Sequence, residues 1–177
     1  GVQTLVAARL FTYNRCPRGD TGAVLANVMF DLDAVSLSTH HRSGGGLWLC
    51  GALATFGLTD DFVQSDDEHS TGTVRVKLDP GGQPDFTITY PSAWDFLEWS
   101  APLQHLAKSA DAVSFGSLAQ RSPKSKQTIT AFLHALRPDA ATVFDVNLRQ
   151  SFYSAEVLRD SISRSTIVKL NQDEVSK

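Results

Sequence analysis

The sequence predicts an α/β fold with a parallel β-sheet, and three observations in the second half of the 177-residue chain predict it. Short apolar segments typical of buried strands lie at 111–116, 141–146 and 166–170. Segments with the hydrophobic period of an amphipathic helix lie between them. The resulting order of strand, helix, strand, helix, strand is typical of right-handed βαβ units and therefore of a parallel sheet.

The predicted helices are defined by their first residues and by their apolar faces. Ser122 followed by Pro123 is a helix-start signal, and Pro138 ends this helix. Ser154 begins the second helix, and Asn171 is expected to open a third. The residues expected to face the sheet are Ile129, Phe132, Leu133 and Leu136 in the first helix, and Val157, Leu158 and Ile162 in the second.

The middle of the chain predicts a β-hairpin with one face in water. Residues 73–78 and 86–90 alternate apolar and polar side chains, and residues 79–82 form a turn between them. Such a hairpin is either a sheet edge or a flap over a site. Before it, residues 47–58 predict an apolar helix, and after it residues 91–99 predict an aromatic-rich crossing segment.

The first part of the chain has the least regular pattern. Residues 24–37 are apolar, but Asp31 and Asp33 interrupt both the helical and the strand period. Residues 40–46 and residues 65–69 are expected to be solvated loops, and the histidines at 40 and 41 are not expected to bind a metal.

Composition and charge exclude several classes of protein. The chain has 16 basic and 19 acidic residues, a net charge of −3 and no basic run, so neither nucleic acid nor a membrane surface is an expected partner. No apolar run approaches the roughly 20 residues that span a bilayer. We expect no signal peptide, and Cys16 and Cys50 lack metal or redox spacing, which favours a cytoplasmic protein with free thiols.

Polar residues follow the second predicted strand of the parallel sheet. Because side chains alternate along a strand, Asp145, Asn147 and Arg149 are expected to point the same way. Ligands bind beyond the carboxyl ends of parallel strands, and an arginine fork matches phosphate or hydroxyl oxygens. The pattern therefore predicts a site for a polyhydroxylated or phosphorylated ligand, with an Asp145–Arg149 pair closing the sheet edge as the alternative.

A second polar motif, Asn171-Gln-Asp-Glu174, follows the next predicted strand. Asparagine at a helix N-cap with glutamate three residues later is the pattern of a capping box. The same helix N-terminus could instead face phosphate groups, with Glu174 holding a hydrated Mg²⁺. The spacing by itself favours the capping box, and the two interpretations are compatible.

Together, the segments Asp145-Val-Asn-Leu-Arg149 and Lys169-Leu-Asn-Gln-Asp-Glu174 resemble PfkB-type, ribokinase-like carbohydrate kinases, particularly the fructokinase branch. Further matches, in order along the chain, are Thr71-Gly-Thr-Val74, Leu78-Asp79, Gly82-Gln-Pro84, Ala93-Trp-Asp95 and Phe115-Gly-Ser-Leu-Ala-Gln-Arg121. The resemblance implies an incomplete Rossmann-like three-layer α/β/α sandwich over residues 1–177, with residues 71–92 as a small β lid. It also implies transfer of the ATP γ-phosphate to a hydroxyl of a fructose-like furanose, with Mg²⁺.

The resemblance assigns expected roles to residues at matching positions. Asn171 would bind the nucleotide phosphates, and Glu174 would hold Mg²⁺ through water. The residues expected to contact the sugar are Asn27, Gln120, Arg121, Asn147 and Arg149. For Asn27, a solvent-exposed turn residue is the alternative.

The family's catalytic base, an aspartate in a glycine-rich turn, is expected beyond Lys177. We therefore expect the isolated chain to be inactive as a kinase, and the alternative function is a non-catalytic sugar-binding remnant. A sheet that stops after the strand at 166–170 would expose an edge, so a homodimer is a further expectation.

Overall fold

The computed structural model describes residues 5–8, 22–24, 34–36, 38–41, 61–78 and 80–176. The helix expected at 47–58 lies outside these residues. Within them, the main sheet has the strand order β10-β9-β8-β1-β3, and all its pairs are parallel. Its strands are β1 (Leu5–Ala8), β3 (Ala34–Ser36), β8 (Ala112–Gly116), β9 (Ala141–Asp145) and β10 (Ile167–Lys169). The last three lie inside the three predicted segments, which confirms the parallel α/β fold.

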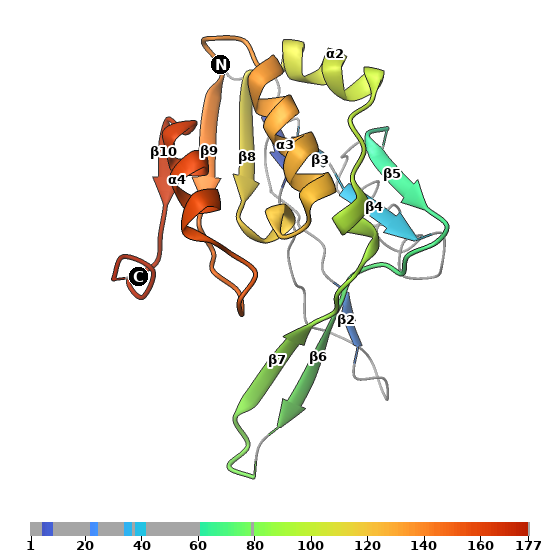
Figure 1. The fold of residues 1–177 in the computed structure, drawn as a ribbon, viewed down its shortest axis with the longest axis vertical. Coiled ribbons are helices and arrows are strands. Elements are labelled where there is room, and N and C mark those ends of the chain that lie inside the picture. Colours follow the sequence, from blue (N-terminus) through green and yellow to red (C-terminus); the bar gives the residue numbers. More distant parts are fainter. Residues whose placement is uncertain are drawn as a thin grey trace.

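Helices α3 (Pro123–Ala135) and α4 (Ala155–Ser163) connect these strands and lie on one face of the sheet (Figure 1). Both begin as predicted. The Ser122 hydroxyl accepts a hydrogen bond from the backbone N–H of Ser125, and Ser154 does the same for Val157. Helix α2 (Ala101–Ser109) precedes β8 and contacts α3. No helix in the described part of the chain is long and apolar enough to cross a membrane.

The core lies between the sheet and these helices. The rings of Phe115 on β8 and Phe144 on β9 are almost fully buried, with centroids 5.2 Å apart. The prediction of which α4 side chains face the sheet is partly wrong, because Ile162 is 46% exposed whereas Ser161 is buried. Val157 and Ser161 are four residues apart and face the sheet together. Ile162 follows one position later, about 100° around the helix, and points outward.

The predicted hairpin consists of β6 (Thr73–Leu78) and β7 (Pro84–Ile88). With β2 (Gly22–Val24) it forms an antiparallel sheet in the order β2-β6-β7. Gly82 adopts a φ of 80° in the connecting turn, a backbone conformation that favours glycine. The hairpin extends away from the main sheet on the side where β8 and β9 end (Figure 1), and this position brings its base close to the loops that follow these strands.

A short crossing segment follows the hairpin, as predicted, and contains the 3₁₀-helix η1 (Ala93–Phe96). The ring of Trp94 lies against Gly72 just before β6. A Cβ atom at residue 72 would lie 2.7 Å from a ring carbon of Trp94, so only glycine permits this approach. The contact fixes the crossing segment against the start of the hairpin.

Two predicted loops are partly strand. The strands β4 (Ser38–His41) and β5 (Val63–Asp66) pair in parallel, so the expectation of loops at 40–46 and 65–69 is wrong for residues 40, 41, 65 and 66. Both strands are short and rich in polar residues, so neither has the hydrophobic period by which a strand is predicted. The helix expected to open at Asn171 is also wrong within the described residues, because residues 172–176 form turns.

Candidate functional site

The loops after β9 and β10 are joined by the carboxylate of Glu174. Its Oε1 accepts a hydrogen bond from the backbone N–H of Leu148 at 2.8 Å, and its Oε2 accepts one from Asn171 N at 2.9 Å. Asn171 Oδ1 in turn accepts a hydrogen bond from Glu174 N at 2.9 Å. The reciprocal pair of Asn171 and Glu174 is the predicted capping-box arrangement. The hydrogen bond from Leu148 to Glu174 brings the two polar motifs together at one edge of the sheet.

The orientation predicted for the first motif is wrong. Strand β9 ends at Asp145, and Asn147 has a φ of 38°, so the alternation of side chains does not continue beyond the strand. The carboxylate of Asp145 is buried and forms an ion pair with Lys169 Nζ at 3.1 Å, rather than the Asp–Arg pair that we considered. The side chain of Arg149 is exposed and has no hydrogen bond or ion pair within the described residues.

Arg121 is buried beneath the hairpin and held by Asp95. Its Nε donates to Asp95 Oδ1 and its Nη2 donates to Asp95 Oδ2, each at 2.7 Å, and both side chains are 1% exposed. Nη2 also donates to the carbonyl oxygen of Thr89 at 2.8 Å, one residue after β7. The guanidinium lies against the rings of Tyr90, Trp94 and Phe152, with its carbon 4.6–5.0 Å from the three centroids. A bidentate, desolvated pair of this kind orients both partners strongly.

Two hydrogen-bond donors in this neighbourhood are buried without an acceptor. Within the part of the chain that the structure describes, neither Arg121 Nη1 nor Trp94 Nε1 has a hydrogen-bond partner. Buried donors are normally satisfied, so these two can accommodate an oxygen from a ligand or from water.

Gln120 and Asn27 were also predicted to contact a sugar. The structure buries Gln120 and directs its Nε2 atom toward the carbonyl oxygen of Gly116 and the hydroxyl of Ser161, each at 3.0 Å. Its amide thus joins the end of β8 to α4, and the predicted sugar contact stays a prediction. Asn27 lies outside the described residues.

Sequence reasoning missed two residues that organise this region. Asp95 was recognised only as part of a motif, although the pattern of a capping box around Ser92 marks it as a hydrogen-bonding residue. Gln150 accepts a hydrogen bond from the backbone of Ile88, which is 62 residues away, and no local pattern could have revealed this contact.

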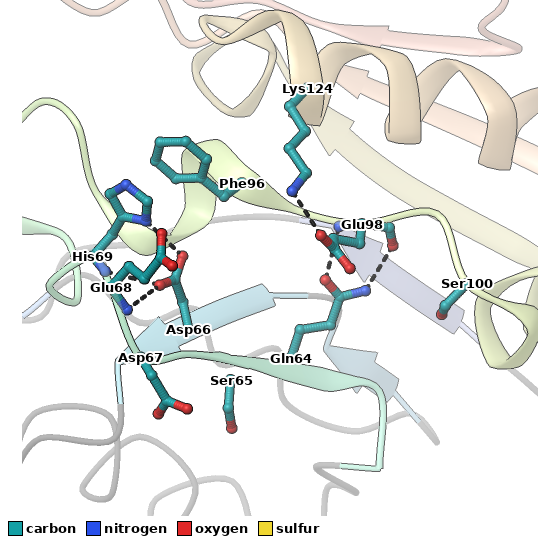
Figure 2. Close-up of a pocket in the computed structure, with 10 residues that line it drawn as sticks. All are labelled: Gln64, Ser65, Asp66, Asp67, Glu68, His69, Phe96, Glu98, Ser100 and Lys124. Atoms are coloured by element: carbon teal, nitrogen blue, oxygen red, sulfur yellow. Dashed lines mark hydrogen bonds and ion pairs between the residues drawn. The ribbon is translucent and has the colours of Figure 1, made fainter.

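A separate cavity of about 760 Å³ lies beside β5 and η1 (Figure 2). It is lined by Gln64, Ser65, Asp66, Asp67, Glu68, His69, Phe96, Glu98, Ser100 and Lys124, none of which was predicted to form a site. The His69 ring stacks on Phe96 with centroids 3.6 Å apart. The described residues contain no cluster of three or more metal-ligating side chains.

Asp66 organises the turn that borders this cavity. Its carboxylate accepts hydrogen bonds from the backbone N–H groups of Glu68 and His69 and contacts His69 Nδ1 at 2.9 Å. Burial opposes ionisation of this carboxylate, but the three hydrogen bonds and the charge of His69 outweigh it and hold the pKa of Asp66 below its ordinary value.

Acidification is therefore expected to remove the stability that Asp66 contributes. Because its folded-state pKa lies below the ordinary value of 3.8, this contribution is complete above pH 3.8 and is lost as the pH falls through the lowered pKa. Denaturation of the wild type and of Asp66→Asn between about pH 6 and about pH 2 should show a stability difference that narrows toward acid. A difference that stays constant would contradict this assignment.

Solved structures place this arrangement in a known fold class. The chain superimposes on the crystal structure of an uncharacterized sugar kinase from Pyrococcus horikoshii, solved in complex with ATP, with a TM-score of 0.76. The identity is 20%, and the match covers 98% of this chain and 64% of that one. The fold is thus that of the ribokinase-like α/β kinases, as the sequence predicted.

Sequence comparison defines the family. The model of the pfkB family carbohydrate kinases matches residues 49–177, so the chain belongs to this family. The Pyrococcus horikoshii sugar kinase is 27% identical over 136 residues, and an Escherichia coli fructokinase is 31% identical over 130 residues. These matches cover 73% and 69% of this chain, but only 44% and 41% of the relatives. The matched segments therefore span less than half the length of these two curated relatives.

Proposed function

We propose that the chain forms the amino-terminal part of a kinase that transfers the γ-phosphate of ATP to a hydroxyl of a fructose-like furanose. The observation that carries this proposal is the pair of hydrogen bonds from Leu148 and Asn171 to Glu174. It holds the two polar loops at the carboxyl edge of a parallel sheet, where ligands of α/β folds bind. The fructokinase named among the relatives supports the choice of sugar.

Five side chains are proposed to contact the sugar near this edge, and among them Gln120 is assigned on the family pattern. Arg149 is exposed and directly follows Leu148, whose backbone N–H donates to Glu174. Its guanidinium can donate to hydroxyl or phosphate oxygens. The partnerless Arg121 Nη1 supports a further contact to a sugar oxygen. Asn147, which precedes Arg149 in the same loop, and Asn27 are assigned to the sugar on the family pattern.

ATP and Mg²⁺ are the proposed co-substrate and metal. The ATP complex of the Pyrococcus horikoshii structure supports the nucleotide, and Asn171 is the proposed phosphate contact. Each oxygen of Glu174 accepts one backbone hydrogen bond and keeps a lone pair, so the carboxylate fits a hydrated Mg²⁺ held through water. The metal would neutralise phosphate charge. The use of ATP favours a cytoplasmic location.

The hairpin β6–β7 is proposed to act as the lid of a single kinase domain over residues 1–177, with residues 71–92 as the moving part. It projects beyond the ends of β8 and β9 (Figure 1), where a closed lid would exclude water from the sugar and the phosphates. The base that removes the proton from the sugar hydroxyl is proposed to come from a segment beyond Lys177.

Two assays test the proposed function. The complete product of the gene should convert ATP and a sugar from a panel of furanoses and pyranoses into ADP and a sugar phosphate. Titration calorimetry on the 177-residue chain, with fructose and with Mg·ATP, separates the alternative of a non-catalytic sugar-binding remnant. Sugar binding by the chain together with absence of turnover in the complete product would favour that alternative, whereas absence of both would overturn the kinase proposal.

The 177-residue chain is expected to self-associate through the edge of β10, which pairs only with β9 among the described strands. Ile167 on this strand is 55% exposed, and Leu170 follows it with 44% exposed. An open strand edge with apolar side chains is a template for a second copy. Ile167→Lys should shift the chain toward monomer in light scattering and change stability by less than about 0.5 kcal/mol. A monomeric wild type would contradict this expectation.

A further inference from the structure

We infer that Gln150 is a positioning residue that couples the loop carrying Arg149 to the hairpin β6–β7. This inference rests on the proposed function for its consequence, since it concerns how the lid is placed over the sugar. Its structural basis is one long-range hydrogen bond, in which the backbone N–H of Ile88 donates to Gln150 Oε1 at 3.0 Å.

The hydrogen bond satisfies a backbone group that the hairpin leaves unpaired. Thr89 N donates to Thr73 O at 2.9 Å, so Thr89 faces β6 and the N–H of the preceding residue, Ile88, points to the outer edge of β7. Strand β7 is the last strand of its sheet, and no other strand is available there among the described residues. Gln150 takes the place that a neighbouring strand would occupy.

Gln150 is held in position by the backbone of its own loop. Asn147 and Gln150 have φ values of 38° and 46°, in the left-handed region that residues other than glycine rarely adopt. The loop is further closed by a hydrogen bond from Phe152 N to Arg149 O at 3.1 Å. A change in the conformation of this loop would move Gln150 and break its contact with the hairpin.

A second tether limits how far the hairpin can move. Arg121 Nη2 donates to Thr89 O, and the ring of Tyr90 lies 6.1 Å from that of Phe152. Loss of the Gln150 contact is therefore expected to loosen the outer edge of β7 while its base stays attached. A sugar that engages Arg149 would stabilise the loop and, through Gln150, the position that the hairpin has in this structure. This coupling is reciprocal by thermodynamic linkage.

Amide hydrogen exchange on the 177-residue chain tests the coupling without any ligand. In Gln150→Ala, the exchange rates of the Ile88 and Phe152 amides should both rise about tenfold. Gln150→Glu keeps an acceptor oxygen and should restore both rates, whereas Gln150→Met keeps the length of the side chain and should not. Gln127→Ala, on the exposed face of α3, is the matched control and should leave both rates unchanged. Wild-type rates for either amide in both Gln150→Ala and Gln150→Met would overturn the inference.

Sugar titration adds a readout that a purely structural role would not move. If the wild-type chain binds fructose, Gln150→Ala should weaken binding about fivefold, and Gln150→Glu should recover it. Equal affinities for the wild type and Gln150→Ala would overturn the coupling. If the wild-type chain binds no sugar, the proposed sugar site is incomplete without the rest of the kinase, and the exchange rates alone decide whether Gln150 couples loop and hairpin.

Discussion

Replacing Arg121 with methionine is expected to lower the free energy of unfolding by about 3–5 kcal/mol. Methionine fills a similar volume among the aromatic rings, but the carboxylate of Asp95 then remains buried without its cationic partner. An uncompensated buried charge costs far more than the lost contact itself. Chemical denaturation of wild type and variant measures the difference.

The exposed ion pair between Lys124 and Glu98 provides the matched control. Its atoms are also 2.7 Å apart, but the two side chains are 47% and 69% exposed. Lys124→Met should therefore cost about 0–1 kcal/mol. In the double variant Arg121→Met, Asp95→Asn, removal of the carboxylate charge should recover much of the lost stability. A double-mutant cycle would measure this recovery as the coupling free energy between the two residues. An Arg121→Met variant no less stable than Lys124→Met would contradict the buried pair.

Replacing Arg149 with alanine is expected to lower kcat/KM for sugar phosphorylation by about 10²–10³-fold in the complete gene product. The side chain of Arg149 is exposed and has no partner among the described residues, so its removal should change the stability of the chain by less than about 0.5 kcal/mol. A large loss of activity without a loss of stability is the signature of a residue that contacts substrate or phosphate.

The control for this variant is Arg159→Ala on the exposed face of α4, which removes an equal charge away from the strand ends. It should keep full activity. Equal kcat/KM values for Arg149→Ala and the wild type would remove Arg149 from the proposed site, and a matching loss in Arg159→Ala would attribute the effect to net charge.

The part of the site that sequence could predict is the part that local patterns encode. The spacing of Asn171 and Glu174 predicts a capping box, because both groups lie within one turn of the chain. The order of strands and helices predicts that the loops after β9 and β10 meet at one edge of the sheet. The hydrogen bond between Glu174 and Leu148 agrees with that prediction.

The predictions that failed depended on where a strand or a helical face ends. Alternation placed Asp145, Asn147 and Arg149 on one side, but the left-handed backbone at Asn147 interrupts it directly after β9. The helical period predicted that Ile162 faces the sheet. In the structure the neighbouring Ser161 is buried and accepts a hydrogen bond from Gln120, whereas Ile162 is exposed. A hydrophobic period restricts the orientation of an element but leaves its exact rotation to its neighbours.

By itself, the sequence determined the parallel α/β fold, the hairpin and the family, because apolar period, turn residues and motif order are properties of nearby residues. Only the tertiary structure decided that Arg121 pairs with Asp95, that Lys169 pairs with Asp145 and that Gln150 binds Ile88. These partners lie 24–62 residues apart along the chain. Folding brings them together because burial of the core fixes how the elements pack, and no pattern within one element specifies its partner in another.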